Sequence, residues 1–129
     1  TYVACNQCET VFLNPVFTDA EIENYYRTNH DLQSTIVAQD FGFYRRLYTK
    51  GLEMFSPSFS SSTKTILDIG CSAGGFLNIA KEFGWKTFGL EYNQGEAKVA
   101  RQNGHEVFEM NIKSFLKASD QKFDVVTLW

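Results

Sequence analysis

Two acidic residues and a cluster of glycines have the residue types and the spacing of a ligand-binding site. The stretch Ile66–Leu77 is ILDIGCSAGGFL, in which Asp68 precedes a glycine-rich loop that begins at Gly70. A second acid, Glu91, ends the next apolar run. Glycines let the backbone approach a ligand closely, and a carboxylate at Glu91 can accept hydrogen bonds from both hydroxyls of a ribose. The pattern predicts a site for a nucleotide-like cofactor.

The glycines alone leave two cofactor classes open. A nicotinamide fingerprint needs glycine at the first, third and sixth loop positions, which are Gly70, Ser72 and Gly75 here. The other register uses Gly70, Ser72 and Gly74, and it also loses one glycine to Ser72. Asp68 separates the two, because a carboxylate beside the loop repels a pyrophosphate but attracts the sulfonium and ammonium groups of S-adenosylmethionine. The sequence therefore favours S-adenosylmethionine.

Strand and helix patterns alternate around this loop. The elements expected after a serine-rich break at 56–64 are strands at 65–69, 86–90, 106–110 and 123–128, and helices at 75–83, 96–102 and 112–117. Before the break, apolar residues recur at helical spacing from about 39 to 55. Alternation of this kind predicts βαβ units with right-handed crossovers. The expected fold class is α/β, a Rossmann-like doubly wound parallel sheet.

The first 38 residues carry a different pattern and are expected to form a separate unit, with the cofactor-binding domain at 39–129. Cys5 and Cys8 form a CxxC pair between two β-prone runs. Such a pair is half of a four-ligand zinc site, and we expect no metal in this chain. Thr18 and Glu21 form a capping box that predicts a helix over 19–27.

Two tyrosines in this predicted helix have alternative interpretations. Tyr25 and Tyr26 could be core aromatics, or one of them could face the cofactor. The second interpretation makes the helix and residues 28–38 a mobile, lid-like cover over the site.

Composition restricts the classes of partner and location. The chain has 129 residues, 43% of them apolar, and a net charge of -3, with three cysteines. The acidic balance argues against a nucleic-acid partner, and no apolar run approaches the roughly 18 residues that span a membrane. Three cysteines do not make a disulfide framework, which indicates a reduced, cytoplasmic protein.

Four segments together resemble a known family. ILDIGCSAGGFL, FGLEYN, EMNIKSF and FDVVTLW, in this order and spacing, are similar to the successive motifs of class I S-adenosylmethionine-dependent methyltransferases over about 39–129. The segment CNQCETVFLNPVFTDAEIENYY is similar to a bacterial subfamily in which a cysteine knuckle and a Tyr-Tyr helix precede that domain, although Glu9 replaces its usual glycine. The resemblance implies methyl transfer to a small-molecule acceptor, and the acidic charge disfavours RNA or DNA.

The resemblance also assigns roles to residues. Asp68 and Gly70 are expected to order the loop at the methionine end, and Glu91 to bind the ribose. Ser72 stands where the family usually has glycine, and Asn111 where it usually has an aspartate that reaches the adenine amino group. No general base is identified. The complete cofactor-binding set implied is Asp68, Gly70, Cys71, Ser72, Gly74, Phe76, Glu91, Tyr92, Asn111, Ile112 and Trp129.

The family sheet has the strand order 3-2-1-4-5-7-6, which implies that this chain supplies strands 3, 2, 1 and 4. The run 123–128 is then a central strand without its usual neighbour, and an open apolar edge predicts self-association through it. Two alternatives to the methyltransferase stay open at this point. They are a nicotinamide-dependent oxidoreductase domain and a non-catalytic module that binds a cofactor or zinc.

Overall fold

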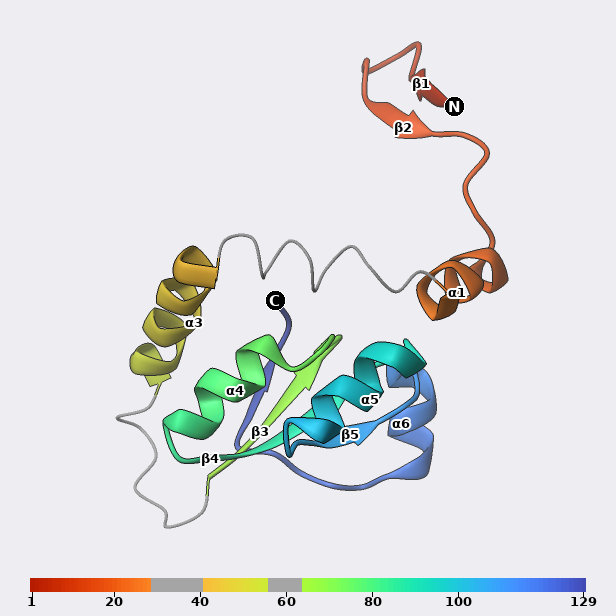
Figure 1. Cartoon of the computed structure of the whole chain (residues 1–129). Helices are drawn as coiled ribbons and strands as arrows, with labels where there is room; N and C mark the ends of the chain where they lie inside the picture. Colours follow the sequence, from red (N-terminus) through yellow and green to blue (C-terminus); the bar gives the residue numbers. More distant parts are fainter. Residues whose placement is uncertain (29–40, 56–63) are drawn as a thin grey trace.

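The chain folds around a four-stranded parallel sheet with the order β5-β4-β3-β6 (Figure 1). The computed structural model describes residues 1–28, 41–55 and 64–129. The strands are β3 (Lys64–Ile69), β4 (Trp85–Leu90), β5 (Glu106–Phe108) and β6 (Val125–Thr127). All three strand pairs are parallel, which confirms the predicted α/β class and the predicted strand order.

Helices connect or flank these strands as the sequence predicted. They are α3 (Phe41–Phe55), α4 (Gly75–Glu82), α5 (Gln94–Gln102) and α6 (Ile112–Ala118). α5 and α6 each begin after an asparagine whose side chain accepts a backbone N–H of the first turn. Asn93 accepts from Glu96 at 3.0 Å and Asn111 accepts from Ser114 at 2.8 Å. These caps fix where the two helices begin, directly beside the strand ends.

Two strands are shorter than predicted. The segment 106–110 is a strand only to Phe108, because the chain then turns and the Met110 N–H donates to the Phe108 carbonyl at 3.0 Å. The segment 123–128 pairs with β3 only over Val125–Thr127. Phe123 packs in the core before the strand begins, and Leu128 is 72% exposed after it. The strand lengths predicted from the apolar runs were therefore too long in both cases.

The core has two halves, one on each face of the sheet. Successive strand residues point to opposite faces. Ile66 therefore packs with side chains from α3, α4 and α5, whereas its neighbour Leu67 packs with Phe115 of α6. Figure 1 shows the same layers, with α4 and α5 in front of the strands and α6 behind them. Helices on both faces are typical of a doubly wound sheet.

The N-terminal segment forms a small hairpin followed by one helix. β1 (Tyr2–Ala4) and β2 (Val11–Leu13) pair antiparallel, and α1 (Asp19–Thr28) follows. The Thr18 N–H donates to the Glu21 carboxylate at 2.8 Å, and the Glu21 N–H donates to the Thr18 hydroxyl at 3.3 Å. The capping box is thus confirmed. Residues 29–38 of the predicted lid and the break at 56–63 lie outside the described residues.

One edge of the sheet carries exposed apolar side chains. Within the described residues β6 pairs only with β3, and Val126 is 52% exposed. Self-association through this edge stays a prediction. None of the described helices has the length and apolarity needed to cross a membrane.

Candidate functional site

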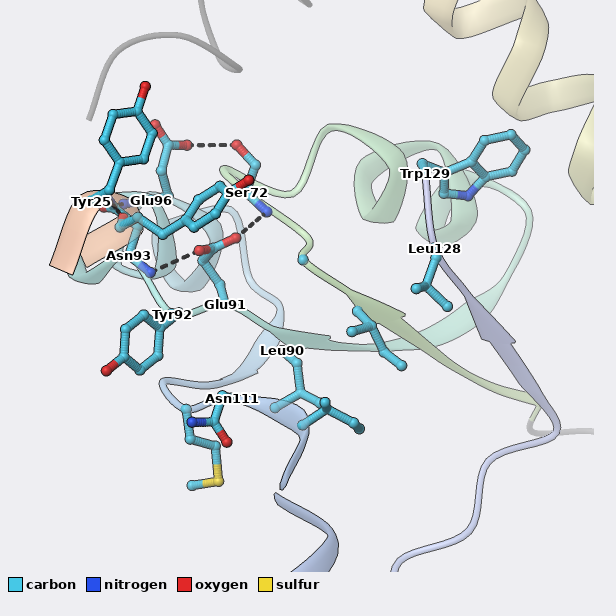
Figure 2. Close-up of a pocket in the computed structure, with 15 residues that line it drawn as sticks. Tyr25, Ser72, Leu90, Glu91, Tyr92, Asn93, Glu96, Asn111, Leu128 and Trp129 are labelled. Atoms are coloured by element: carbon cyan, nitrogen blue, oxygen red, sulfur yellow. Dashed lines mark hydrogen bonds between the residues drawn. The ribbon is translucent and has the colours of Figure 1, made fainter. Parts of the chain in front are cut away.

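A pocket of about 420 Å³ opens where the carboxyl ends of β3, β4 and β6 meet the start of α5 and α6 (Figure 2). Its volume is within the usual range for a small-molecule site, and ligands of open α/β sheets bind at this end of the strands. Seven of the predicted site residues line it: Gly70, Ser72, Glu91, Tyr92, Asn111, Ile112 and Trp129. Four others, Asp68, Cys71, Gly74 and Phe76, do not.

The glycine loop is held against β4 by its own backbone. The N–H groups of Gly70 and Cys71 both donate to the Leu90 carbonyl, at 2.7 and 3.0 Å. Ser72 has a φ of +49°, in the left-handed region that glycine adopts at lower cost. This backbone angle explains why glycine is usual at that position. The Ser72 hydroxyl donates to the Glu96 carboxylate at 2.8 Å, a contact that glycine cannot make.

Glu91 is the most completely fixed acid in the pocket. One carboxylate oxygen accepts the Ser72 N–H at 2.8 Å, and the other accepts the Asn93 N–H at 2.7 Å (Figure 2). Each carboxylate oxygen has a further lone pair, so Glu91 can still accept hydrogen bonds from a ligand. The two backbone donors orient the carboxylate before any ligand arrives.

Asp68 lies behind this pocket wall. Its side chain is 3% exposed and accepts a hydrogen bond from the Thr127 hydroxyl at 2.8 Å, so it joins β3 to β6. Burial raises the pKa of Asp68 to about 7, while the Thr127 hydrogen bond opposes the rise and the charge of Glu91 adds to it. The buried carboxyl is therefore harder to ionise than an exposed aspartate.

The other three residues away from the pocket support its walls. The Cys71 thiol packs over Gly89, where an added Cβ would lie 2.3 Å from the sulfur. Burial raises the pKa of the Cys71 thiol far above its usual range, so this residue packs rather than reacts. Gly74 faces a histidine from the turn before β5, and Phe76 packs its ring 5.3 Å from that of Trp129.

The opposite ends of the pocket have different chemistry. At one end, Trp129 and Leu128 follow β6, and the Trp129 ring packs against Tyr48 of α3 as well as Phe76 of α4. At the other end, the Tyr92 hydroxyl accepts a hydrogen bond from the Arg27 guanidinium. Asn111 lies at this second end, and its amide donates to the Glu23 carboxylate at 3.2 Å. One end of the pocket is therefore aromatic, and hydrogen-bonded polar groups form the opposite end.

A family model described as a methyltransferase domain matches residues 40–129, more than two thirds of the chain. The chain belongs to this methyltransferase family.

Solved structures agree with this methyltransferase fold. The plantazolicin methyltransferase BpumL in complex with SAH has a TM-score of 0.63 and 20% identity, covering 83% of this chain and 44% of its own. The magnesium protoporphyrin IX methyltransferase ChlM from Synechocystis PCC 6803 with bound SAM has a TM-score of 0.61 and 15% identity, covering 90% of this chain and 64% of its own. Streptomyces venezuelae DesVI has a TM-score of 0.56 and 21% identity, covering 77% and 44%. No curated protein sequence matches the chain.

These matches confirm the incomplete Rossmann-like methyltransferase fold and favour it over the nicotinamide alternative. The chain spans less than half of the length of BpumL and of DesVI. In this methyltransferase domain, β4 lies on one side of β3 and β6 lies on the other. The pocket is at the carboxyl ends of these strands, where the strand order reverses.

Tyr25 and Tyr26 line the pocket and are 54% and 62% exposed, so their interpretation as core aromatics was wrong, and the alternative interpretation agrees with the lining. Sequence reasoning missed Asn93 and Glu96, which also line the pocket. The spacing Asn-x-x-Glu is a helix-start signature that could have drawn attention to both, but it says nothing about a ligand.

The cysteine pair of this methyltransferase lies in the β1–β2 hairpin, away from the pocket. The Cys5 N–H donates to the Thr10 carbonyl at 2.9 Å, and Glu9 has a φ of +60°. That angle accounts for the glycine that the related sequences usually have there. In the part of the chain that the structure describes, no group of three or more potential metal ligands occurs.

Proposed function

We propose that this domain is the cofactor-binding part of an S-adenosylmethionine-dependent methyltransferase. The observation that carries the proposal is Glu91, which two backbone N–H groups fix at the carboxyl end of β4 in a pocket of a methyltransferase-family chain. BpumL and ChlM, which share the fold, were solved with SAH and SAM. This supports the same cofactor here.

The charges that line the pocket suit this cofactor. Glu91 and Glu96 contribute carboxylates, and among the described lining residues there is neither lysine nor arginine. Such a lining attracts a sulfonium and an ammonium, and it repels a pyrophosphate. When bound, S-adenosylmethionine supplies an electrophilic methyl group on its sulfonium.

In this proposal the residues of the chain bind and orient the cofactor. Glu91 accepts the ribose hydroxyls, and Gly70 lets the backbone approach the methionine end beside Trp129. Tyr92, Asn111 and Ile112 surround the adenine. Asp68, Cys71, Gly74 and Phe76 hold the loop and the aromatic wall in place from behind. Positioning of the methyl group supplies much of the catalysis in an in-line displacement.

The acceptor and the organisation of the chain belong to the proposal as well. We infer a small-molecule acceptor and no nucleic-acid partner from the net charge of -3. The structural relatives named above include a plantazolicin and a magnesium protoporphyrin IX methyltransferase, so the fold accommodates different acceptors. We assign 1–38 to a knuckle and lid-like helix and 39–129 to the cofactor domain. A bacterial origin and a cytoplasmic location stay predictions.

Calorimetric titration of the full-length protein with S-adenosylhomocysteine tests the proposal. Glu91→Gln places an amide donor against the N–H of Ser72 or Asn93 and removes the charge. Affinity should fall roughly ten- to a hundred-fold, the effect of losing about 1.5–3 kcal/mol from charge-assisted hydrogen bonds.

A matched control for Glu91→Gln is available on the surface. Glu82→Gln removes an exposed carboxylate that pairs with Arg45 of α3, away from the pocket, and should leave the affinity unchanged. Equal affinity of Glu91→Gln and wild type would refute the assignment. So would binding of NAD in place of S-adenosylhomocysteine.

A further inference from the structure

Four residues of the pocket form a closed ring of hydrogen bonds. The N–H groups of Asn93 and Ser72 donate to the two oxygens of Glu91, at 2.7 and 2.8 Å. The Ser72 hydroxyl donates to Glu96 at 2.8 Å, and the Glu96 N–H returns to the Asn93 side-chain oxygen at 3.0 Å. Figure 2 shows Glu91 between Ser72 and Asn93, with Glu96 to the left of Ser72. The ring connects the loop after β3 to the start of α5.

Asn93 extends this ring to α1, which is remote in sequence. Its side-chain amide donates to the carbonyls of Tyr26 and Arg27, at 3.0 and 3.4 Å. Both carbonyls belong to the last turn of α1, where carbonyl groups have no partner within the helix. Asn93 is 4% exposed and α1 has no buried residue, so these hydrogen bonds are partly buried. One side chain therefore caps α5 with its oxygen and holds the end of α1 with its nitrogen.

The polar contacts of α1 with Tyr92, Asn111 and Lys113 are all exposed. The ion pair between Asp19 and Lys113 has a separation of 3.9 Å, and both side chains are more than four-fifths exposed. Exposed pairs of this kind contribute little free energy. No residue of α1 is buried. The hydrogen bonds of the Asn93 amide are therefore more buried than these other polar contacts between α1 and the domain.

We propose that Asn93 is a positioning residue that couples the docking of α1 to cofactor binding, an inference that rests on the proposed function. A ligand that hydrogen-bonds to Glu91 fixes the ring, and the ring orients the Asn93 amide toward the end of α1. Docked α1 in turn brings Tyr25 and Tyr26 to the pocket wall. Because coupling between two sites is reciprocal, docked α1 strengthens cofactor binding by the same factor by which the bound cofactor strengthens the docking of α1.

Two substitutions distinguish the role of the Asn93 side-chain oxygen, which caps α5, from that of its nitrogen, which binds α1. Serine and aspartate are both good N-cap residues, so Asn93→Ser and Asn93→Asp keep the hydrogen bond from Glu96 and the start of α5. Serine is too short to reach both carbonyls of α1. Aspartate keeps the shape of the side chain but places a carboxylate against those carbonyls. Asn24→Ser, the same exchange on α1 itself, is the matched control.

The experiment measures S-adenosylhomocysteine affinity and amide hydrogen exchange over 19–28 in the full-length protein. In wild type and in Asn24→Ser, the ligand should increase protection of 19–28. In Asn93→Ser the affinity should fall about two- to tenfold, the range for a lost neutral hydrogen bond, and the increase in protection should disappear. Asn93→Asp should bind more weakly still. The thermal unfolding midpoints should stay close to that of wild type.

The outcomes separate this inference from the proposed function. Wild-type affinity in Asn93→Ser together with a wild-type increase in protection overturns the coupling and leaves the proposed function standing. If wild type itself does not bind S-adenosylhomocysteine, the proposed function fails and the coupling fails with it. A loss of affinity in Asn93→Ser with an unchanged protection increase also overturns the coupling, because the residue would then act on the ligand site alone.

Discussion

Replacing Asp68 by asparagine should change the pH dependence of stability in a predictable direction. Burial raises the pKa of Asp68 from 3.8 to about 7. The folded protein therefore holds the proton more tightly than the unfolded chain does. The contribution of Asp68 to stability is complete below about pH 4 and is lost as the pH rises to about 7. A pKa difference of about three units corresponds to about 4 kcal/mol in total.

Denaturant unfolding of full-length wild type and Asp68→Asn, from about pH 4.5 to about pH 8, measures this effect. Relative to wild type, the variant should gain about 1.4 kcal/mol per pH unit until about pH 7 and then level off. Asn cannot ionise, and its oxygen can still accept the hydrogen bond from Thr127. Comparing the two proteins at each pH removes the contributions of all other groups.

Asp124 provides a control of opposite sign. Its exposed carboxylate accepts the N–H and the hydroxyl of Thr65, at 2.7 and 2.8 Å, and these hydrogen bonds lower its pKa. Its contribution to stability is present above the unfolded pKa and is lost as the pH falls. Asp124→Asn should therefore be less stable than wild type at neutral pH, with the gap closing in acid. Parallel curves for Asp68→Asn and wild type would refute the reasoning about burial.

Two further predictions concern the loop and the sheet edge. Gly74→Ala should destabilise the domain by about 1–3 kcal/mol in denaturant unfolding, because the φ of Gly74 is +85° and the new Cβ would lie 2.8 Å from His105 Cδ2. Gly42→Ala in α3, where the Cβ meets only Arg46 at 3.7 Å, should not destabilise it, and equal effects would contradict the argument. The 129-residue chain made alone should self-associate in sedimentation through β6, and Val126→Lys should reduce this association by placing a charge on the edge. A soluble wild-type monomer with β6 open would show that this edge needs no cover.

The sheet was predictable from the sequence because its signals are local, and apolar runs mark β3 and β4. The start of α5 was predicted two residues late, because Asn93 was not recognised as its cap. The burial of Asp68 behind the pocket wall was not predictable in this way. A strand-end acid can point into a pocket or into the core, and its partner Thr127 is 59 residues away. The same holds for Asn93, whose cap is local but whose second partner, α1, is 66 or 67 residues earlier.

The depth of Asp68 changes the electrostatic argument for the cofactor. The sequence predicted that Asp68 is the acid that repels a pyrophosphate. In the structure it does not line the pocket, and burial raises the pKa of its carboxyl to about 7. Glu91 and Glu96 are the acids at the pocket surface. Discrimination against a pyrophosphate therefore depends mainly on these two carboxylates. A cationic ligand would favour the ionised form of Asp68 through the wall, so its binding near pH 7 should release a proton.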